Sequence, residues 1–152
     1  MNWKEAARLG QQAFRDNQYR QAIAHHCKAR ELALAEFEQL AVQQPDPAVA
    51  AVMVCEINLA ESFVALEEWS ACNACFDSAE RFLDDATAVL MDTGLEACLR
   101  GAAFLRQERC LLCQTHPQLT QASKASALSS TDLLSLHSRP GPIAEHLKKG
   151  LH

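Results

Sequence analysis

The spacing of apolar residues along the chain is that of amphipathic helices. Over residues 19–43, small, apolar and aromatic side chains recur at steps of three and four residues, at Ala22, His26, Ala29, Ala33, Phe37 and Leu40. This period places them on one face of a helix. We therefore predict an all-α protein with a helix content above about 60%, against a usual share of about one-third, and with no strand.

Polar and proline-containing breaks divide the chain into six predicted helices. Asn2 followed by Glu5 is a capping pair that starts the first helix, which ends near Asp16. Asp46 is the predicted cap of the third helix, and Gly94 is the predicted left-handed residue after the fourth. The helices after the first are expected over residues 19–43, 47–66, 69–91, 95–113 and 118–127.

The last part of the chain has a weaker pattern. A Ser-rich stretch and a Pro-Gly-Pro break at residues 140–142 precede a short amphipathic end. We interpret residues 1–127 as one helical domain and residues 128–152 as a C-terminal tail, either mobile or docked as a short helix on a partner surface. The 152 residues correspond in length to one ordinary domain.

An internal repeat underlies the helical pattern. Residues 9–29 align without a gap on residues 59–79, so similar side chains recur 50 positions later. The matched pairs are Leu9 with Leu59, Gly10 with Ala60, Tyr19 with Trp69, Ala22 with Cys72, His26 with Phe76 and Ala29 with Ala79. This order of a large apolar residue, a small one, an aromatic after a polar turn, and then small, aromatic and small resembles the tetratricopeptide repeat (TPR) family.

The resemblance implies antiparallel helical hairpins stacked in a TPR-like right-handed superhelix or bundle. About two repeats are complete, over residues 3–91, and a partial third begins at Leu95. Small residues such as Gly10, Ala22 and Ala60 let two helices approach to the short end of an interaxial range of about 8–10 Å. The copies are 50 residues apart, against about 34 in the family, because the helix over 19–43 is unusually long.

For function, the resemblance implies recognition of a partner protein by an adaptor, a chaperone or a regulatory subunit. The first helix of each hairpin would line a concave face that holds an extended peptide or a partner helix. The expected partner-binding side chains are Lys4, Arg8, Gln11, Arg15, Asn58 and Glu61. Within each helix these residues are three, four or seven positions apart, so they share one side of it.

Composition and charge narrow the function classes. A formal net charge of −5, with Lys and Arg scattered among Asp and Glu, argues against a nucleic-acid partner. Early charges at Lys4, Glu5 and Arg8 argue against a signal peptide, and no window reaches the roughly 18 uninterrupted apolar residues of a membrane span. We therefore expect a cytoplasmic protein. Because no phosphate-binding loop, nucleophile elbow or catalytic set can be identified, we expect neither enzyme activity nor a cofactor.

Seven cysteines supply the candidate metal and redox chemistry. Cys72 with Cys75, and Cys110 with Cys113, form two CxxC pairs, a spacing suited to a zinc site or to thiol redox chemistry. Both pairs fall inside predicted helices, so we interpret them as reduced, packed thiols without a metal. Two alternatives to a protein-binding module stay open. One is a zinc or redox sensor, and the other is a self-associating bundle, a homodimer, in which a second copy covers the incomplete third repeat.

Overall fold

Six α-helices and no strand make up the part of the chain that the computed structural model describes, residues 1–129. Helices account for 89% of these residues, which confirms the all-α prediction. Their bounds are α1 Trp3–Arg15, α2 Tyr19–Gln43, α3 Pro45–Ala65, α4 Trp69–Val89, α5 Thr93–Thr115 and α6 Gln118–Ser129. The predicted domain boundary at residue 127 falls inside α6, and the predicted tail lies, from residue 130 onward, outside the described residues.

Local sequence signals place the first two helices correctly. At the start of α1, the backbone N–H of Glu5 donates to the Asn2 side chain at 3.0 Å, and the backbone N–H of Asn2 donates to Glu5 Oε2 at 2.9 Å. This is the predicted capping box, which satisfies two N–H groups that have no partner within the helix. The α2 helix begins and ends at the predicted residues.

The start of α3 and the role of Asp46 were predicted wrongly. The helix begins at Pro45, two residues early, and Gln44 precedes it without a side-chain cap. A proline suits this first position because its missing N–H would have no partner there. The Asp46 carboxylate instead accepts two hydrogen bonds from Arg100 of α5, from Nε at 2.7 Å and Nη2 at 2.8 Å. Asp46 therefore ties two helices together rather than capping one.

The prediction for Gly94 is also wrong. The residue with positive φ between α4 and α5 is Asp92, at 50°, whereas Gly94 lies in the first turn of α5. A Cβ on Gly94 would come within 2.5 Å of the Leu90 Cβ. Gly94 thus provides room for the chain that enters the helix, and α4 ends at Val89, two residues earlier than expected.

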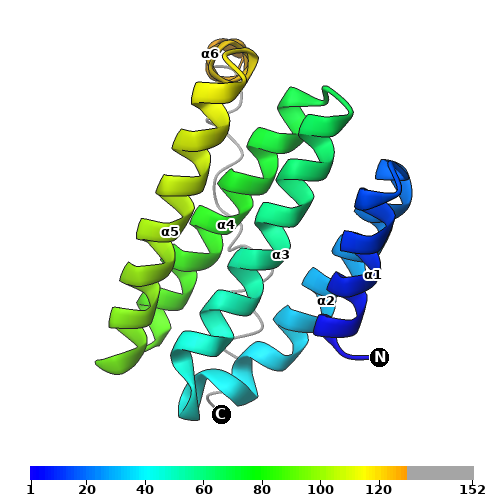
Figure 1. Cartoon of the computed structure of the whole chain (residues 1–152). Helices are drawn as coiled ribbons and strands as arrows, with labels where there is room; N and C mark the ends of the chain where they lie inside the picture. Colours follow the sequence, from blue (N-terminus) through cyan, green and yellow to red (C-terminus); the bar gives the residue numbers. More distant parts are fainter. Residues whose placement is uncertain (130–152) are drawn as a thin grey trace.

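The helices are arranged in two rows (Figure 1). The α1, α3 and α5 helices lie in the nearer row, with α3 between the other two, and α2 and α4 lie behind them. Each of α2 to α5 runs back along the preceding helix, and α6 crosses the end of the bundle, where it packs on α4 and α5. Because α1 and α3 make only a narrow contact, the α1/α2 hairpin leans away from α3 at the end that carries its turn.

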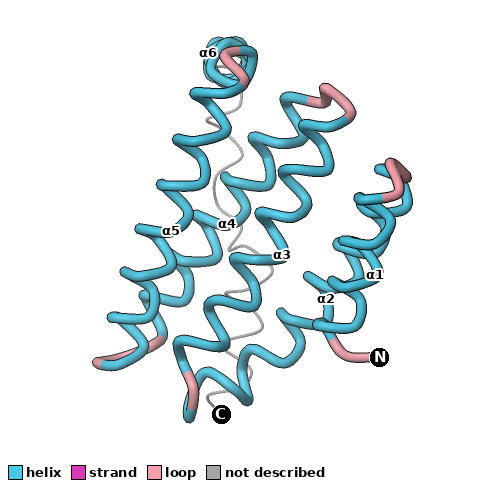
Figure 2. Tube along the Cα trace, viewed as in Figure 1, coloured by secondary structure: helices cyan, strands magenta, loops and turns pink. Residues whose placement is uncertain are grey.

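The 50-residue repeat is visible in the backbone of two turns. Asn17 and Glu67 occupy equivalent positions and have φ angles of 59° and 57°. In the first turn the N–H of Gln18 donates to the Ala13 carbonyl at 2.8 Å, and in the second the N–H of Glu68 donates to Phe63 at 2.9 Å. Figure 2 shows both turns at the same end of the bundle. The alignment of residues 9–29 with 59–79 therefore matches two similar helical hairpins.

Small residues lie where the helices cross. Ala22, Ala60 and Cys72 are completely buried, as are Ala29 and Ala79. A Cβ on Gly10 would lie only 2.4 Å from Cε1 of His26, so the α1 backbone rests directly on the His26 ring of α2. The predicted reason for these small side chains, close approach of neighbouring helices, is the geometry found at Gly10.

Enlarging either of two such residues will destabilise the protein. We expect Ala22→Leu and Ala60→Leu each to lower the free energy of unfolding by about 1–3 kcal/mol, because the added side chain has no space at a helix crossing. Urea unfolding followed by circular dichroism measures the change. Ala24→Leu, at an exposed position of α2, is the control and will have a small effect. Unchanged stability in both buried variants would contradict the role given to these crossings.

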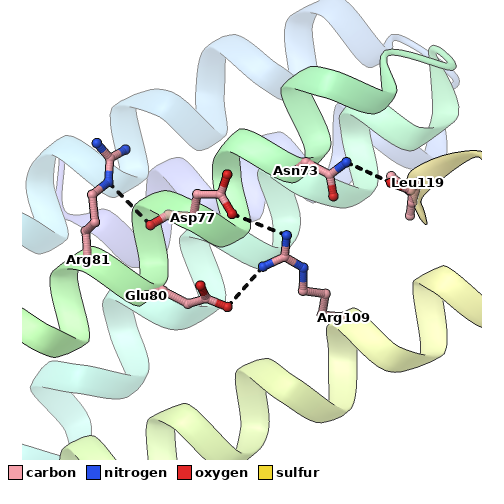
Figure 3. A network of polar contacts seen from close by, with 6 residues as sticks. All are labelled: Asn73, Asp77, Glu80, Arg81, Arg109 and Leu119. Carbon is pink, nitrogen blue, oxygen red and sulfur yellow. Dashed lines mark hydrogen bonds and ion pairs between the residues drawn. The ribbon is translucent and has the colours of Figure 1, made fainter. Parts of the chain in front are cut away.

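Ion pairs and one buried amide fix α5 and α6 against α4 (Figure 3). The Arg109 guanidinium of α5 reaches both Asp77 at 3.2 Å and Glu80 at 3.0 Å on α4, and it lies 5.3 Å from the centre of the Phe76 ring. Deeper in the bundle, the Asn73 side chain donates to the backbone carbonyl of Leu119 at 3.0 Å. These contacts orient α5 and α6 against α4.

The central helix, α3, is the most apolar one. Its length and composition alone would also suit a membrane span, but 67% of its most apolar window is buried inside the bundle. It packs on α2, α4 and α5, which accounts for that composition in a core helix. The face of α3 that these neighbours leave accessible becomes important for the site.

Candidate functional site

A cleft of about 180 Å³ lies between α1 and α3, with α2 contributing to its wall. Its lining residues are Gln11, Phe14 and Arg15 of α1, His26 of α2, and Asn58 and Glu61 of α3. Four of the six predicted partner-binding residues, Gln11, Arg15, Asn58 and Glu61, therefore meet in one cavity.

Helix geometry explains why these residues meet. Gln11 and Arg15 are one turn apart on α1, and Asn58 and Glu61 are nearly one turn apart on α3, so each pair occupies one side of its helix. Because α1 and α3 are the first helices of successive, similar hairpins and lie in one row, their equivalent sides border the same cleft at the narrow α1/α3 contact. Gly10 lets α2 come close enough for His26 to reach the cleft.

The histidine in the cleft is buried and neutral. Only 2% of His26 is exposed, and burial, assisted by the neighbouring His25, lowers its pKa to about 4. At neutral pH the imidazole is therefore uncharged, with one nitrogen that donates and one that accepts. Its Nδ1 atom has no hydrogen-bond partner, and neither has Nδ2 of Asn58, which is also buried. Most buried polar atoms in proteins are paired, so two unpaired ones on residues that line the same cleft are unusual.

The remaining polar groups give the cleft both signs of charge. Partial burial raises the pKa of the Glu61 carboxyl, and the nearby carboxylate of Glu108 on α5 raises it further. On the opposite side, the Arg15 guanidinium donates to the Gln12 side chain at 3.0 Å and stays exposed. One cationic and one anionic side chain thus lie among neutral donors and acceptors, and Phe14 provides an apolar wall.

The other two predicted residues do not line the cleft. Lys4 and Arg8 are exposed on α1, and the Lys4 ammonium lies 5.7 Å from the centre of the Trp3 ring. Sequence reasoning missed Phe14 and His26 as site residues. The available signal was the repeat alignment, in which a polar imidazole at position 26 replaces the phenylalanine of the second copy, Phe76.

A second cavity, of about 370 Å³, lies further along the same accessible side of α3. It is lined by Asp46, Pro47, Ala50 and Met53 of α3 and by Ala97, Arg100, Gly101 and Phe104 of α5. Ala50 and Asn58, which line different cavities, are about 12 Å apart along the helix axis. Ala50, Val54, Asn58 and Glu61, three or four positions apart, thus form a partly accessible stripe, which we call the α3 stripe.

Another buried polar group is fully engaged inside the bundle. Glu56 is 3% exposed, and its carboxylate contacts the Arg30 guanidinium at 3.3 Å and accepts a hydrogen bond from Ser78 at 2.9 Å. Burial raises the pKa of Glu56, while Arg30 and Ser78 oppose that rise. Since both oxygens have partners, this group joins α2, α3 and α4 rather than forming an open site.

The cysteine pairs do not converge on a metal geometry. Cys72 and Cys75 are buried, Cys113 is half-buried and Cys110 is exposed, and all seven thiols are free. Burial raises the pKa of both Cys72 and Cys75 to about 12, which disfavours the thiolate that metal binding and disulfide exchange require. Within residues 1–129, no group of three or more His, Cys, Asp or Glu side chains is placed to hold a metal ion.

In comparisons with known proteins, the chain matches no family model, no curated protein and no solved structure. The geometry of the cleft and the α3 stripe are therefore the features that bear on function.

Proposed function

We propose that this protein is a TPR-like interaction module that holds a peptide or helix of a partner protein along the α3 stripe. The observation that carries the proposal is the α1–α3 cleft, in which His26 Nδ1 and Asn58 Nδ2 are buried without partners. Burying a polar atom without a hydrogen bond is costly, so a bound polar group would stabilise the site. The second cavity, with its apolar lining, offers a place for an apolar side chain of the same ligand.

Two further features support a TPR-like reading. The turns at Asn17 and Glu67 repeat each other in backbone angles and hydrogen bonds, as stacked hairpins of a repeat protein would. The first helices of the hairpins, α1, α3 and α5, lie in one row and present their accessible sides together. We propose in addition that the protein is cytoplasmic and has no enzyme activity.

A second candidate function, self-association, is favoured by one observation. Leu95 and Leu99, one turn apart on α5, are 41% and 62% exposed, and a second copy could cover them. Light scattering distinguishes the two proposals, since a monomer at micromolar concentration contradicts a stable homodimer.

Peptide selection tests the binding proposal without knowledge of the partner. Immobilised protein is used to select binders from a displayed library of random peptides, and their affinities are measured by calorimetry. We expect Arg8→Ala with Arg15→Ala, and separately Asn58→Ala with Glu61→Ala, to weaken binding at least tenfold while the melting temperature changes little. Exposed side chains such as Arg8 and Arg15 contribute within about 0.5 kcal/mol to folding. Removing Asn58 also removes a buried donor that has no partner, so its loss breaks no side-chain hydrogen bond.

The matched control is Lys28→Ala with Glu31→Ala, an exposed ion pair on α2. This variant removes two charged side chains away from the cleft and leaves peptide affinity unchanged. Full affinity in both the Arg8/Arg15 and the Asn58/Glu61 variants, or an equal loss in the control variant, would contradict binding along α1 and the α3 stripe.

A further inference from the structure

The α1–α3 cleft has a defined pattern of donors and acceptors, from which the chemistry of its ligand can be worked out. Asn58 Nδ2 is a donor without a partner, so a ligand must present an acceptor to it. The Glu61 carboxylate in the same lining is an acceptor, so the ligand also gains from presenting a donor. The neutral His26 ring has one nitrogen of each kind and can serve either group.

An ionic side chain of either sign would meet one like charge in the cleft, because the lining holds both Arg15 and Glu61. A carboxylate placed beside Asn58 would face Glu61, with Glu108 of α5 adding to the repulsion. An ammonium or guanidinium group would share the cleft with Arg15 and would leave the unpaired N–H of Asn58 without an acceptor. An aliphatic side chain would cover His26 and Asn58 while leaving both polar atoms unpaired.

We infer that the cleft takes a primary amide, the side chain of a glutamine or asparagine in the bound peptide. Its carbonyl accepts from Asn58 Nδ2, and its NH₂ group donates towards Glu61. The neutral His26 ring lies beside these groups, and the ring of Phe14 covers the methylene groups of the ligand. This inference rests on the proposed function, because it specifies one anchoring side chain of the ligand held there.

A direct test uses four small probes rather than a partner protein. N-acetyl-N-methylamides of glutamine, glutamate, lysine and leucine are titrated into the full chain, and the NMR signals of the His26 ring and the Asn58 side-chain amide are followed. We expect the glutamine probe to shift both signals with saturation, and to bind at least tenfold more tightly than the other three. Preference for the glutamate, lysine or leucine probe would overturn the inference. So would equal response to all four, or no response to any, which would mean that the cleft holds only water.

Two variants sharpen the test. Asn58→Leu replaces the amide donor with an apolar side chain of similar size. We expect this variant to bind the glutamine probe at least tenfold more weakly. Asn58→Asp replaces the donor with an acceptor and will shift the preference from the glutamine probe to the lysine probe. An unchanged preference in Asn58→Asp contradicts the assigned role of Asn58. The α2 control, Lys28→Ala with Glu31→Ala, will bind the glutamine probe as the unmodified protein does.

Failure of the inference can be told apart from failure of the proposed function. If selected peptides bind and lose affinity in the cleft variants but share no glutamine or asparagine, the protein is a peptide-binding module and the amide inference is wrong. If no peptide binds above background while the glutamine probe saturates the cleft, the amide site stands without the peptide-binding function.

Discussion

A His26→Phe variant will lose about 3 kcal/mol less stability than the unmodified protein as the pH falls from 6.5 to 4. The pKa of His26 is lowered from 6.5 to about 4 by burial, so the folded protein resists protonation that the unfolded chain accepts. A group of this kind contributes stability that is complete above its unfolded pKa and is lost as the pH falls towards the folded one. The difference between 6.5 and 4 corresponds to about 3 kcal/mol at 1.36 kcal/mol per pH unit.

Urea unfolding at pH 7 and at pH 4 measures the effect. Phenylalanine is the chosen replacement because Phe76 occupies the equivalent position of the second hairpin and is also buried. Glu56 acts in the opposite sense, since its raised pKa gives stability that is lost as the pH rises through that pKa, but both proteins share this contribution. The reciprocal variant, Phe76→His, will lose more stability in acid than the unmodified protein. Parallel pH profiles for His26→Phe and the unmodified protein would show that His26 is not the acid-sensitive group.

A Phe82→Ala variant will lower the free energy of unfolding by about 3–5 kcal/mol, the usual cost of truncating a buried phenylalanine. The ring of Phe82 on α4 is 1% exposed and packs edge-on against Phe37 of α2, with ring centres 4.9 Å apart. Phe37 lies in the second half of α2, and this half makes the repeat longer than the usual length of about 34 residues. The Phe82 ring of α4 thus adds to the packing of α3 against the extra turns of α2.

Chemical denaturation at neutral pH tests this prediction, with Val42→Ala as the control. Val42 is 82% exposed near the end of α2, and its truncation will change stability by less than about 0.5 kcal/mol. In the double variant Phe37→Ala with Phe82→Ala, the loss will be smaller than the sum of the two single losses, because each single change already removes the ring contact. A loss below about 1 kcal/mol in Phe82→Ala would mean that α2 is not anchored there.

The parts of the fold that could be predicted are those set by neighbours in sequence. The capping pair of Asn2 with Glu5 and the period of α2 act within one or two turns, so the sequence displays them directly. The contact of Asp46 with Arg100 could not be predicted in this way, because its partners are 54 residues apart and meet only when α3 and α5 pack. From its neighbours in sequence alone, Asp46 is predicted to cap the helix that follows it.

In the candidate site, too, only the features that depend on neighbours in sequence could be predicted. Spacing alone put Gln11 and Arg15 on one side of a helix, and likewise Asn58 and Glu61. Their meeting in one cleft depends on how the two hairpins lean, and the presence of His26 depends on a glycine in another helix that lets its ring approach. Lys4 and Arg8 lie on the same side of α1 as Gln11 and Arg15 but outside the cleft. Periodicity predicts which side of a helix a residue occupies, but it does not predict where along the helix axis a cleft lies.

The two tight turns at Asn17 and Glu67 have a consequence for how the chain folds. Each joins helices that are adjacent in sequence, and most of the extensive helix packing is likewise between successive helices. Proteins rich in such local contacts fold on the microsecond to millisecond scale, since little loop entropy is lost before contacts form. During synthesis, domains and their parts become available from the N-terminus at about 5–20 residues per second. The first hairpin can therefore pair as soon as α2 has left the ribosome, seconds before α5 has been made.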